Sequence, residues 1–471
     1  MPDDTCKIMQ TPDLYPIFLK HPFVTTDSRN CREGSIFFAL KGEKFDGNDF
    51  IGQALRNGAA FAVGDRDGLP DDKRIIRVDD ALLSLQNLAS YHRKQLNPEV
   101  IAITGSNGKT TTKELIAAAL STLHPVLFTQ GNLNNHIGVP LTLLQIKPFH
   151  HFAVIEMGAN HPGEIRTLCR IVDPDFGLIT NVGRAHLEGF GSFEGVVRTK
   201  TELYEYIREK NGSVFVNADN LILKKRSRNI KNIYYGTSPE AFIQGKIIES
   251  ESFLEMDWWV SQNSFKQMED RWMAFGYHLQ DERPEILFKK HRVKTQLVGN
   301  YNFENVLAAI SVAVYFNPCK EALHEIFLQL NQAIAAYSPT NNRSQSLKTE
   351  RNHLIIDAYN SNPSSMKAAL DNFLSLNVSP KLAIIGEMKE LGEYSREEHR
   401  QLVGMLRESA IDRVMLCGES FLDTNSMAPE WMVFQHTGEL LDFLRSETVS
   451  GFHILIKGSR ANQLEKTIEF L

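Results

Sequence analysis

A glycine-rich segment carries the residues best suited to hold a phosphate group. An apolar run at 100–104 leads into Gly105 and Gly108, and a helical pattern opens at Lys109. Glycines let the backbone turn tightly, so that N–H groups and the start of the next helix face an anionic oxygen. Lys109 adds a positive charge, and Thr110 offers a hydroxyl to Mg²⁺. The sequence therefore predicts a phosphate loop in a strand-turn-helix unit.

This loop departs from the common P-loop pattern. That pattern has another glycine five residues before Gly108, where this chain has Ile103, so the predicted loop is shorter than usual. The alternative interpretation is a glycine-rich turn that binds no ligand. The candidate nucleotide-binding residues of the segment are Gly105, Ser106, Asn107, Gly108, Lys109, Thr110 and Thr111.

Two further apolar runs lead to residues that could hold a metal ion. Glu156 ends the run 152–156, and a carboxylate there is well placed to bind Mg²⁺ opposite Thr110. His186 follows the run 176–181 in a glycine-rich loop. The alternatives are a solvated glutamate and an exposed, idle histidine. The metal hypothesis depends on the two side chains lying close to each other.

Lys200 lies inside an apolar helical stripe. If Ser192 caps the helix, Lys200 falls in the same stripe as Val197. One interpretation is that the stem packs on the core while the ammonium reaches water. The other is that the amine points into a crevice, where burial lowers its pKa and lets it react with carbon dioxide. The resulting carbamate would be a carboxylate-like metal ligand.

Four polar residues farther along the chain are candidates for nucleotide contacts. Asn302 and Asn305 lie three residues apart at the start of an alanine-rich helix, so they share one helical face. A helix cap by Asn302 is the alternative. Asp357 ends a predicted strand, where a carboxylate accepts ribose hydroxyls, and Arg343 upstream would clamp a phosphate. Ordinary loop positions would explain Asp357 and Arg343 equally well.

Strand and helix patterns divide the chain into three predicted domains. From about residue 98, short apolar runs alternate with helical patterns, which indicates a mostly parallel sheet covered by helices. A second such series begins near residue 350. We predict an α/β protein with a small mixed domain at 1–97, a central P-loop ATPase-like domain at 98–320 and a C-terminal Rossmann-like domain at 321–471. A hinge is expected before Pro318.

The loops after the central strands should converge on one crevice, as in other open α/β sheets. Residues 238–296, which contain Trp258, Trp259 and Trp272, suggest antiparallel strands. The predicted strands are 100–104, 152–156, 176–181 and 213–217 in the central series, and 354–357, 382–386, 414–418 and 454–457 in the second.

Composition excludes several classes of protein. The formal charge of −6 gives no electrostatic footprint for nucleic acid, and no stretch approaches the roughly 18 apolar residues that span a bilayer. The five cysteines are scattered without a Cys-x-x-Cys pair, which favours neither a disulfide framework nor a zinc site. Because the start of the chain lacks a secretory signal pattern, we expect a cytoplasmic protein without nucleic-acid or membrane partners.

Taken together, these segments resemble the Mur ligases, ATP-dependent enzymes that build the peptide stem of the bacterial cell-wall precursor. The resemblance implies ATP and two Mg²⁺ ions as cofactors, a carbamylated lysine and a monomer. It covers the ATP loop 104–111, the metal ligands Thr110, Glu156, His186 and Lys200, the adenine-side Asn302 and Asn305, and the third-domain contacts Arg343 and Asp357.

Within the family, the segments 131–140, 357–366, 386–392 and 457–460 resemble the ligases that add D-alanyl-D-alanine to UDP-N-acetylmuramoyl-tripeptide. Such an enzyme activates the tripeptide carboxylate as an acyl phosphate for attack by the dipeptide amine, with the third domain closing over ATP. The catalytic residues would be Lys109, Glu156, His186 and Lys200. The substrate-binding residues would be Ser28, Arg29, Asp46, Asn48, Asn134 and Asn135.

The chain departs from the family pattern at two positions. Asn48 and Tyr301 stand where the family often has histidine. Two rival functions share the same features: the neighbouring ligase that adds the third amino acid to the dipeptide precursor, and a P-loop switch that hydrolyses nucleotide only to change shape. A ligase requires both co-substrates for turnover, whereas a switch is indifferent to any amine.

Overall fold

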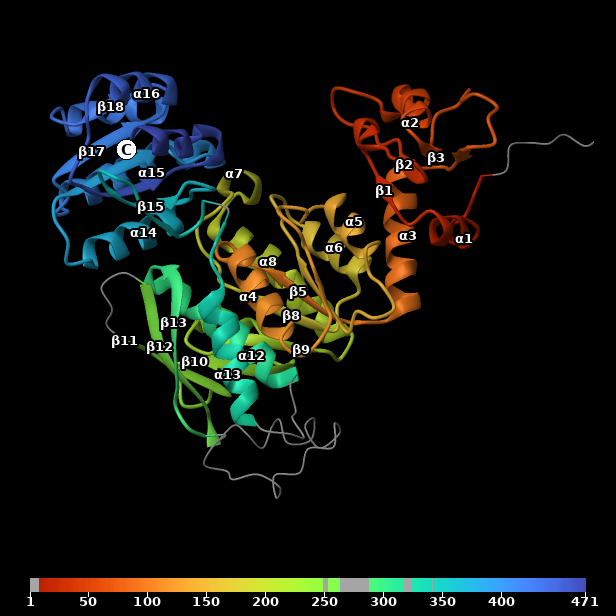
Figure 1. Cartoon of the computed structure of the whole chain (residues 1–471), viewed down its shortest axis with the longest axis horizontal. Coiled ribbons are helices and arrows are strands. Elements are labelled where there is room, and N and C mark those ends of the chain that lie inside the picture. Colours follow the sequence, from red (N-terminus) through yellow and green to blue (C-terminus); the bar gives the residue numbers. More distant parts are fainter. Residues whose placement is uncertain (1–7, 249–252, 263–287, 317–322, 341) are drawn as a thin grey trace, which may run out of the picture. The chain divides into compact units, whose positions relative to one another are not determined.

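The chain folds into two compact units. The computed structural model describes residues 8–248, 253–262, 288–316, 323–340 and 342–471 (Figure 1). Unit 1 comprises Met1–Ile103, His124–Ala159 and Gly163–Gly177, and unit 2 comprises Thr104–Leu123, Asn160–Pro162 and Leu178–Leu471.

Unit 1 begins with a four-stranded parallel sheet in the order β1-β2-β3-β4. All four residues of β2 are buried, as expected for a parallel strand covered on both faces. Asp80 caps helix α3 by accepting a hydrogen bond from the Leu83 N–H at 2.7 Å. The strands are β1 (Val24–Thr25), β2 (Ser35–Phe38), β3 (Ala59–Gly64) and β4 (Ile75–Arg77), and the helices are α1 (Thr11–Lys20), α2 (Ile51–Arg56) and α3 (Ala81–Leu96).

Unit 1 also contains three central strands in the parallel order β5-β7-β6. All five residues of β7 are buried, and its last residue, Glu156, is in register with Ile103 of β5. Glu156 therefore lies at the carboxyl end of β5, where the glycine-rich loop begins. The elements are β5 (Glu99–Thr104), β6 (Val126–Phe128), β7 (Phe152–Glu156), α5 (Gly138–Leu143) and α6 (Glu164–Val172).

Unit 2 begins with the glycine-rich loop and the helix that follows it, and it also contains the strands β9 to β13. Strands β9, β10 and β11 are parallel, whereas β11, β12 and β13 are antiparallel. Helix α12 is apolar on nearly all sides and packs against α4, as expected of a helix whose residues are buried apart from Glu304. The helices are α4 (Lys109–Leu120), α7 (Leu187–Phe190), α8 (Phe193–Glu209), α9 (Leu221–Arg226), α12 (Phe303–Phe316) and α13 (Leu323–Ala336). The strands are β9 (Ser213–Asn217), β10 (Lys231–Gly236), β11 (Ile243–Ile248), β12 (Phe253–Val260) and β13 (His291–Val298).

Strand β8 (Phe176–Ile179) contains the boundary between the units and runs beside β5. In unit 1, the Asp175 N–H donates to the Val100 carbonyl at 3.0 Å. In unit 2, the Thr180 N–H donates to the Thr104 carbonyl at 3.0 Å. The loop after β8 therefore starts beside the loop after β5.

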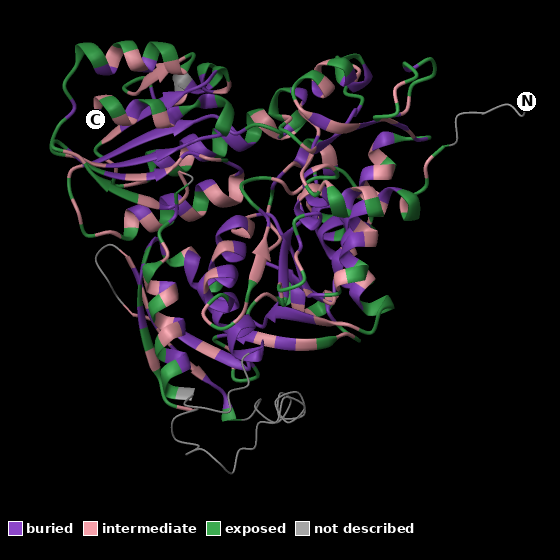
Figure 2. Ribbon diagram, turned by 45° about the vertical axis from the view of Figure 1, so that its right-hand side comes forward, coloured by how far each residue is buried: buried purple, intermediate pink, exposed green. Residues whose placement is uncertain are grey.

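The C-terminal part of unit 2 is a six-stranded sheet in the order β14-β15-β19-β16-β17-β18. Only the edge strand β14 is antiparallel to its neighbour. Buried residues fill the inner strands β16, β17 and β19, whereas the edge strands β14 and β18 contain only half-buried and exposed residues (Figure 2). The elements are β14 (Gln345–Lys348), β15 (His353–Asp357), β16 (Lys381–Gly386), β17 (Arg413–Cys417), β18 (Met432–Phe434), β19 (His453–Lys457), α14 (Pro363–Ser375), α15 (Ser395–Arg407) and α16 (Thr437–Ser446).

The predicted α/β class and both strand series are confirmed, with ends shifted by one or two residues. The antiparallel strands expected within 238–296 are also confirmed where β11 pairs with β12, which carries Trp258 and Trp259. Trp272 and the hinge before Pro318 lie outside the described residues. Helix α13 packs on β13 and α4.

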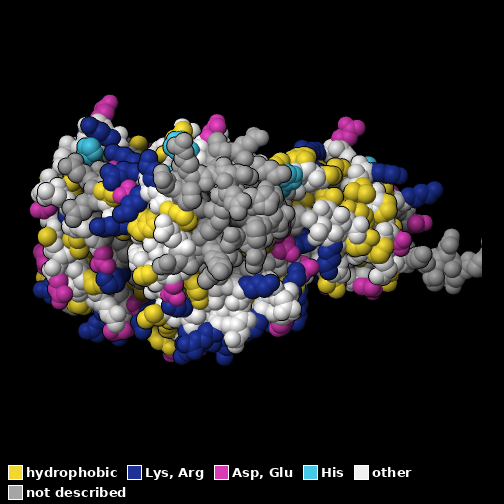
Figure 3. All heavy atoms as spheres, turned by 90° about the horizontal axis from the view of Figure 1, so that it is seen from below, with side chains coloured by type: hydrophobic (Ala, Val, Ile, Leu, Met, Phe, Trp, Pro, Cys, Tyr) yellow, Lys and Arg dark blue, Asp and Glu magenta, His cyan; other side chains and the backbone are white. Residues whose placement is uncertain are grey.

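In the described part of the chain, no helix combines the length and apolar character needed to cross a membrane. On the face in Figure 3, positive and negative side chains both occur in small groups outside the grey region.

A buried arginine ties α3 to the rest of unit 1. Arg93 is 3% exposed and donates to the Asp175 carboxylate at 2.7 Å and to the Val172 carbonyl at 3.2 Å. The same Asp175 oxygen accepts from the Val100 N–H at 2.9 Å. One ion pair thus holds a helix, a strand end and a loop together.

We expect Arg93→Ala to lower the free energy of unfolding by about 2 kcal/mol, because it leaves a carboxylate and carbonyls without their donor. Urea unfolding followed by circular dichroism measures the change. Lys94→Ala, at the exposed neighbouring position, should stay within about 0.5 kcal/mol of the parent. An equal effect from the two substitutions would contradict the role given to Arg93.

Candidate active site

The loop between β5 and α4 has the backbone shape of a phosphate cradle. Gly105 and Gly108 have φ values of +145° and +76°, which favour glycine. A Cβ on Gly105 would lie 2.0 Å from the Thr180 hydroxyl, and a Cβ on Gly108 would lie 2.5 Å from Asn305 Oδ1. Asn107 N–H donates to Asn181 Oδ1 at 3.0 Å. Packing on both sides therefore fixes the loop, and only glycine fits at its two turns.

The side chain of Lys109 folds back over this loop. Its ammonium donates to the carbonyls of Gly105 at 2.9 Å and Ser106 at 3.2 Å. Thr110 and Thr111, in the first turn of α4, are 6% and 7% exposed. Positive charge, helix N-terminus and hydroxyls thus come together as the sequence predicts, in an arrangement that suits phosphate oxygens.

Glu156 is buried and oriented by its neighbours. It is 1% exposed, so the interpretation as a solvated loop glutamate is wrong. Asn134 Nδ2 donates to Glu156 Oε1 at 2.8 Å, and the Glu156 N–H donates to the Thr129 hydroxyl at 3.0 Å. Asn135 instead accepts from the N–H groups of Ile137 and Gly138, so it shapes the start of α5. The two predicted asparagines thus have different local roles.

His186 has a charged partner that the sequence did not reveal. It has φ +52° at the start of α7, and its Nδ1 contacts the carboxylate of Glu390, from the loop after β16. Glu390 also has a positive φ, +63°, which is uncommon outside glycine. The hydrogen bond from His186, aided by the positive charges of His186 and Lys109, holds the pKa of Glu390 below its usual value. The histidine is therefore neither idle nor fully exposed.

Lys200 is buried within α8. Ser192 caps this helix by accepting from the Gly195 N–H at 3.1 Å, as predicted. Lys200 is 1% exposed, so the interpretation in which its ammonium reaches water is wrong. Its Nζ lies 5.2 Å from the centre of the Phe190 ring. Burial of the amine agrees with the hypothesis that it points inward, and its carbamylation stays a prediction.

Asn302 and Asn305 form a buried chain of hydrogen bonds. Asn302 Nδ2 donates to the Val298 carbonyl at 2.9 Å, and Asn305 Nδ2 donates to Asn302 Oδ1 at 3.0 Å. The Thr112 hydroxyl donates to Asn305 Oδ1 at 3.0 Å. Asn305 therefore supports α4 and the glycine turn, and its contact with a nucleotide stays a prediction.

The two third-domain candidates each have a partner in the C-terminal sheet. Asp357 accepts from Lys457 Nζ at 2.6 Å, since β15 and β19 are paired in register there. The Arg343 guanidinium stacks 3.6 Å from the centre of the Tyr359 ring. The Arg460 guanidinium lies 5.4 Å from the centre of the same ring. Tyr359 thus contacts two arginines close to the end of β15, where Asp357 lies.

Ser28 and Arg29 lie in a short turn of the N-terminal sheet. The Ser28 hydroxyl donates to Gln53 Oε1 at 3.3 Å. Arg29 is paired with Asp27 at 2.8 Å, and its side chain is 80% exposed. Both polar groups are therefore locally bonded, and their contact with a substrate stays a prediction.

Asn48 is buried between two carboxylates. Its Nδ2 donates to Asp46 Oδ1 at 2.7 Å and to Asp65 Oδ1 at 3.0 Å, and it is 3% exposed. Asp46 and Asn48 therefore stabilise the loop that contains them. Asn48 also lines a pocket of about 550 Å³. The charged residues that line this pocket are Arg56, Arg66, Arg74, Asp49 and Asp72.

Sequence reasoning missed several residues that meet the predicted site. Glu390 was overlooked because its link to His186 spans 204 residues and follows no local spacing. Asn362 was missed for the same reason, although its Nδ2 donates to Asn107 Oδ1 at 2.8 Å. Asn181 lies two residues after β8, so its place near a strand end was an available signal. Among the described residues, no three His, Cys, Asp or Glu side chains gather as a ready metal site.

Comparison with known proteins identifies the family. Family models match over residues 21–116 (Mur ligase family, catalytic domain), 103–313 (Mur ligase middle domain) and 342–460 (Mur ligase, glutamate ligase domain). A UDP-N-acetylmuramoyl-tripeptide–D-alanyl-D-alanine ligase of Bacillus subtilis is 32% identical, over 95% of this chain and 92% of the relative. The chain belongs to the Mur ligase family.

Other family members agree in sequence and structure. The ligase of the same name from Escherichia coli is 32% identical over 95% of this chain and 93% of its own length. The crystal structure of MurF from Acinetobacter baumannii has a TM-score of 0.79 at 30% identity, and covers 95% of this chain and 92% of that one. MurF ligase from Thermotoga maritima, solved with ADP, has a TM-score of 0.78 at 26% identity, and covers 96% and 97%. The three-domain Mur ligase fold is therefore shared along nearly the whole chain.

We expect Gly108→Ala to weaken ADP binding at least tenfold, because its Cβ would collide with Asn305 and force the cradle open. Isothermal titration with Mg²⁺ and ADP measures the loss. The matched control is Gly163→Ala, which precedes α6 with a similar φ of +85° but has no atom within 4 Å of the added Cβ. The control should bind ADP like the parent. Equal ADP binding by both variants would contradict the interpretation of this loop as a phosphate cradle.

Proposed function

We propose that this Mur ligase joins D-alanyl-D-alanine to UDP-N-acetylmuramoyl-tripeptide, using ATP and giving the UDP-linked pentapeptide precursor of peptidoglycan. The observation that carries the proposal is the phosphate cradle with Lys109 folded over it. It occurs in a chain that matches UDP-N-acetylmuramoyl-tripeptide–D-alanyl-D-alanine ligases along 95% of its length. The family's dependence on ATP agrees with this loop.

The proposed reaction has two steps. The tripeptide carboxylate attacks the terminal phosphorus of ATP, which releases ADP and leaves an acyl phosphate. The dipeptide amine then attacks the acyl carbon, inorganic phosphate leaves, and the amine loses a proton as the amide forms. A carboxylate and a triphosphate repel each other, so positive charge beside the transferred group is the main requirement. Lys109 supplies part of that charge.

The remaining positive charge would come from two Mg²⁺ ions, which neutralise phosphate charge and orient the carboxylate. We assign Thr110 and Glu156 to one ion, and His186 with a carbamylated Lys200 to the other. The oxygen-rich donor set suits Mg²⁺, and the orientation of Glu156 by Asn134 supports its role. An amine is a poor Mg²⁺ ligand, whereas the buried Lys200 would become an oxygen ligand as its carbamate.

Substrate and nucleotide contacts complete the proposal. Arg343 and Asp357 would meet the nucleotide from the third domain, while Asn302 and Asn305 would meet it from the central domain. In the N-terminal domain, the pocket beside Asn48 carries Arg56, Arg66 and Arg74 together with Asp49 and Asp72, and its arginines support binding of the anionic UDP end near Ser28, Arg29 and Asp46. We place the reaction in the cytoplasm and propose a monomer with domains at 1–97, 98–320 and 321–471.

We expect Lys200→Ala to abolish ligation, because the second metal ligand is lost, and added acetate or formate to restore part of the rate by replacing the carbamate oxygens. Product formation is followed by mass spectrometry. Lys210→Ala, at the exposed end of the same helix, is the control and should keep full activity. An active Lys200→Ala variant would remove Lys200 from the metal site.

The amine substrate separates this ligase from its two rivals. We expect phosphate release to require UDP-linked tripeptide, ATP, Mg²⁺ and D-alanyl-D-alanine together, with a product larger by one dipeptide. Release with UDP-linked dipeptide and a free diamino acid would favour the ligase for the third residue. Release that ignores any amine would favour a nucleotide switch. Mass spectrometry of each mixture, with one component omitted in turn, measures the outcome.

A further inference from the structure

Two histidines of unit 1 meet where neighbouring strands begin. His124 precedes β6 by one residue and His151 directly precedes β7, and these two strands are parallel and paired. The Nδ1 atoms of the two rings lie 3.4 Å apart and face each other well enough to share a hydrogen bond. Both residues lie at the amino ends of their strands, whereas Glu156 of the candidate active site lies at the carboxyl end of β7.

Backbone hydrogen bonds hold both histidines in place. The carbonyl of Pro125, next to His124, accepts from the N–H groups of His151 at 3.0 Å and Phe152 at 3.4 Å. The carbonyl of His151 accepts from the N–H of Glu99, the first residue of β5, at 3.0 Å. Because strand residues on both sides anchor these segments, the fold itself brings the two imidazoles together.

The surroundings of the pair orient one ring and leave the other open to solvent. The His124 ring packs edge to face on the Phe152 ring, with centroids 5.1 Å apart. His124 is half-buried and His151 is exposed. The adjacent His150 has a separate partner, since its Nδ1 accepts from the Lys147 N–H at 2.9 Å. The pair therefore presents two imidazole nitrogens beside water.

The separation of the two nitrogens matches that of a zinc site. Tetrahedral Zn²⁺ binds imidazole nitrogen at about 2.0–2.1 Å, which places two such nitrogens about 3.4 Å apart. The alternative occupant of the gap is a single proton, with one Nδ1 donating to the other. A metal ion that replaces this proton needs little movement of either ring. Imidazole suits zinc, copper and nickel, whereas Mg²⁺ prefers oxygen ligands.

We propose that His124 and His151 form a binding site for a divalent transition-metal ion such as Zn²⁺. The Nδ1 atom of each ring donates a lone pair to the ion, and water fills the remaining positions of the tetrahedron. The bound ion joins the segment before β6 to the start of β7. The site is separate from the Mg²⁺ ions proposed for the ligase reaction and does not depend on that reaction.

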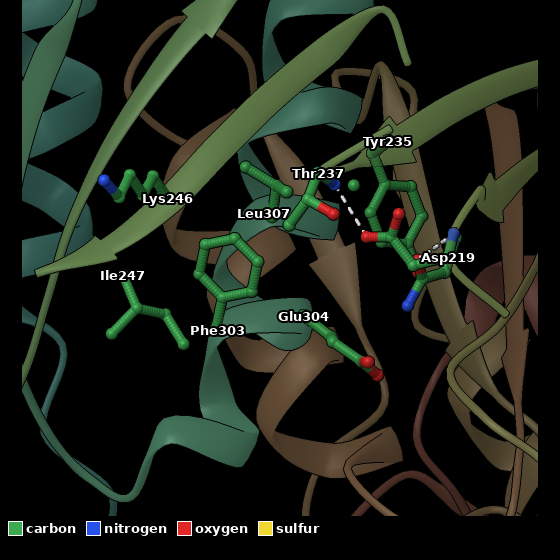
Figure 4. A pocket seen from close by; sticks show the side chains of 10 residues that line it. Asp219, Tyr235, Thr237, Lys246, Ile247, Phe303, Glu304 and Leu307 are labelled. Atoms are coloured by element: carbon green, nitrogen blue, oxygen red, sulfur yellow. Dashed lines mark hydrogen bonds between the residues drawn. The ribbon is translucent and has the colours of Figure 1, made fainter. Parts of the chain in front are cut away.

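Unit 2 contains an acidic recess that could also attract a divalent cation. The recess has a volume of about 360 Å³, and its lining includes Asp219 and Glu304 (Figure 4). The Asp219 carboxylate already accepts from the N–H groups of Thr237 at 2.6 Å and Ser238 at 3.1 Å. Carboxylates suit hard ions, so an excess of Mg²⁺ competes for this recess but not for a pair of imidazoles. Glu304→Gln therefore serves as a control for zinc held by carboxylates.

Isothermal titration of Zn²⁺ into the untagged full chain, with Mg²⁺ in excess, tests the site. The parent should bind zinc, and His124→Ala and His151→Ala should each weaken this binding by about tenfold or more, because the ion loses one of its two protein ligands. Glu304→Gln and His436→Ala, which removes an exposed histidine of the C-terminal part, are the controls and should bind zinc like the parent. No zinc binding by the parent, or unchanged binding by His124→Ala and His151→Ala, would overturn the proposal.

A second measurement needs no variant, so it holds even if a substitution disturbs folding. X-ray absorption at the zinc edge, on the parent loaded with one equivalent of Zn²⁺, should show two imidazole nitrogens at about 2.0 Å together with oxygen ligands. Cu²⁺ should displace the zinc, whereas Mn²⁺ should not. A single imidazole, or oxygen ligands alone, would place the zinc at His186 or on carboxylates and contradict the proposal. Neither measurement requires turnover, so both are independent of the ligase assay.

Discussion

Close packing on both sides of the phosphate loop is the constraint on which the active site depends. The Thr180 hydroxyl occupies the space beside Gly105, and the Asn305 amide occupies the space beside Gly108. Both neighbours come from outside the loop, so its shape is imposed by a strand end and a helix rather than by its own sequence. Lys109 then completes the cradle by bonding to the loop carbonyls. A binding site held in this way needs little rearrangement when an anion enters.

Helix α12 links this cradle to the C-terminal sheet. Asn305 reaches the cradle, while Tyr301, just before the helix, shares a 2.7 Å hydrogen bond with Ser344 at the start of β14. Burial raises the pKa of Tyr301, and the nearby negative charge of Asp357 adds to this, so its hydroxyl stays protonated. One short segment thus contacts both the phosphate cradle and the sheet that carries the third-domain candidates. A displacement of the C-terminal sheet would therefore be transmitted to the cradle through this segment.

Loops of the central part and of the C-terminal sheet meet through polar side chains. Arg184 donates to Glu398 at 2.7 Å, Asn362 donates to Asn107, and Glu390 contacts His186. Polar contacts of this kind are individually weak and reversible, unlike a hydrophobic interface. They would suit the closure of the third domain that we propose, which would exclude water from the acyl phosphate, and its opening to release product. The positive φ of Glu390 fits a residue held by such a contact.

The parts predictable from sequence are those encoded by local spacing. The Gly-Lys-Thr segment, the strand ends and the apolar stripe around Lys200 each depend on residues within one or two turns, and the structure confirms them. Whether Lys200 reaches water could not be inferred, because the answer depends on Phe190 and on the packing of α8. The pairing of His186 with Glu390 could not be inferred either, since residues far apart in sequence meet only after the sheets have formed.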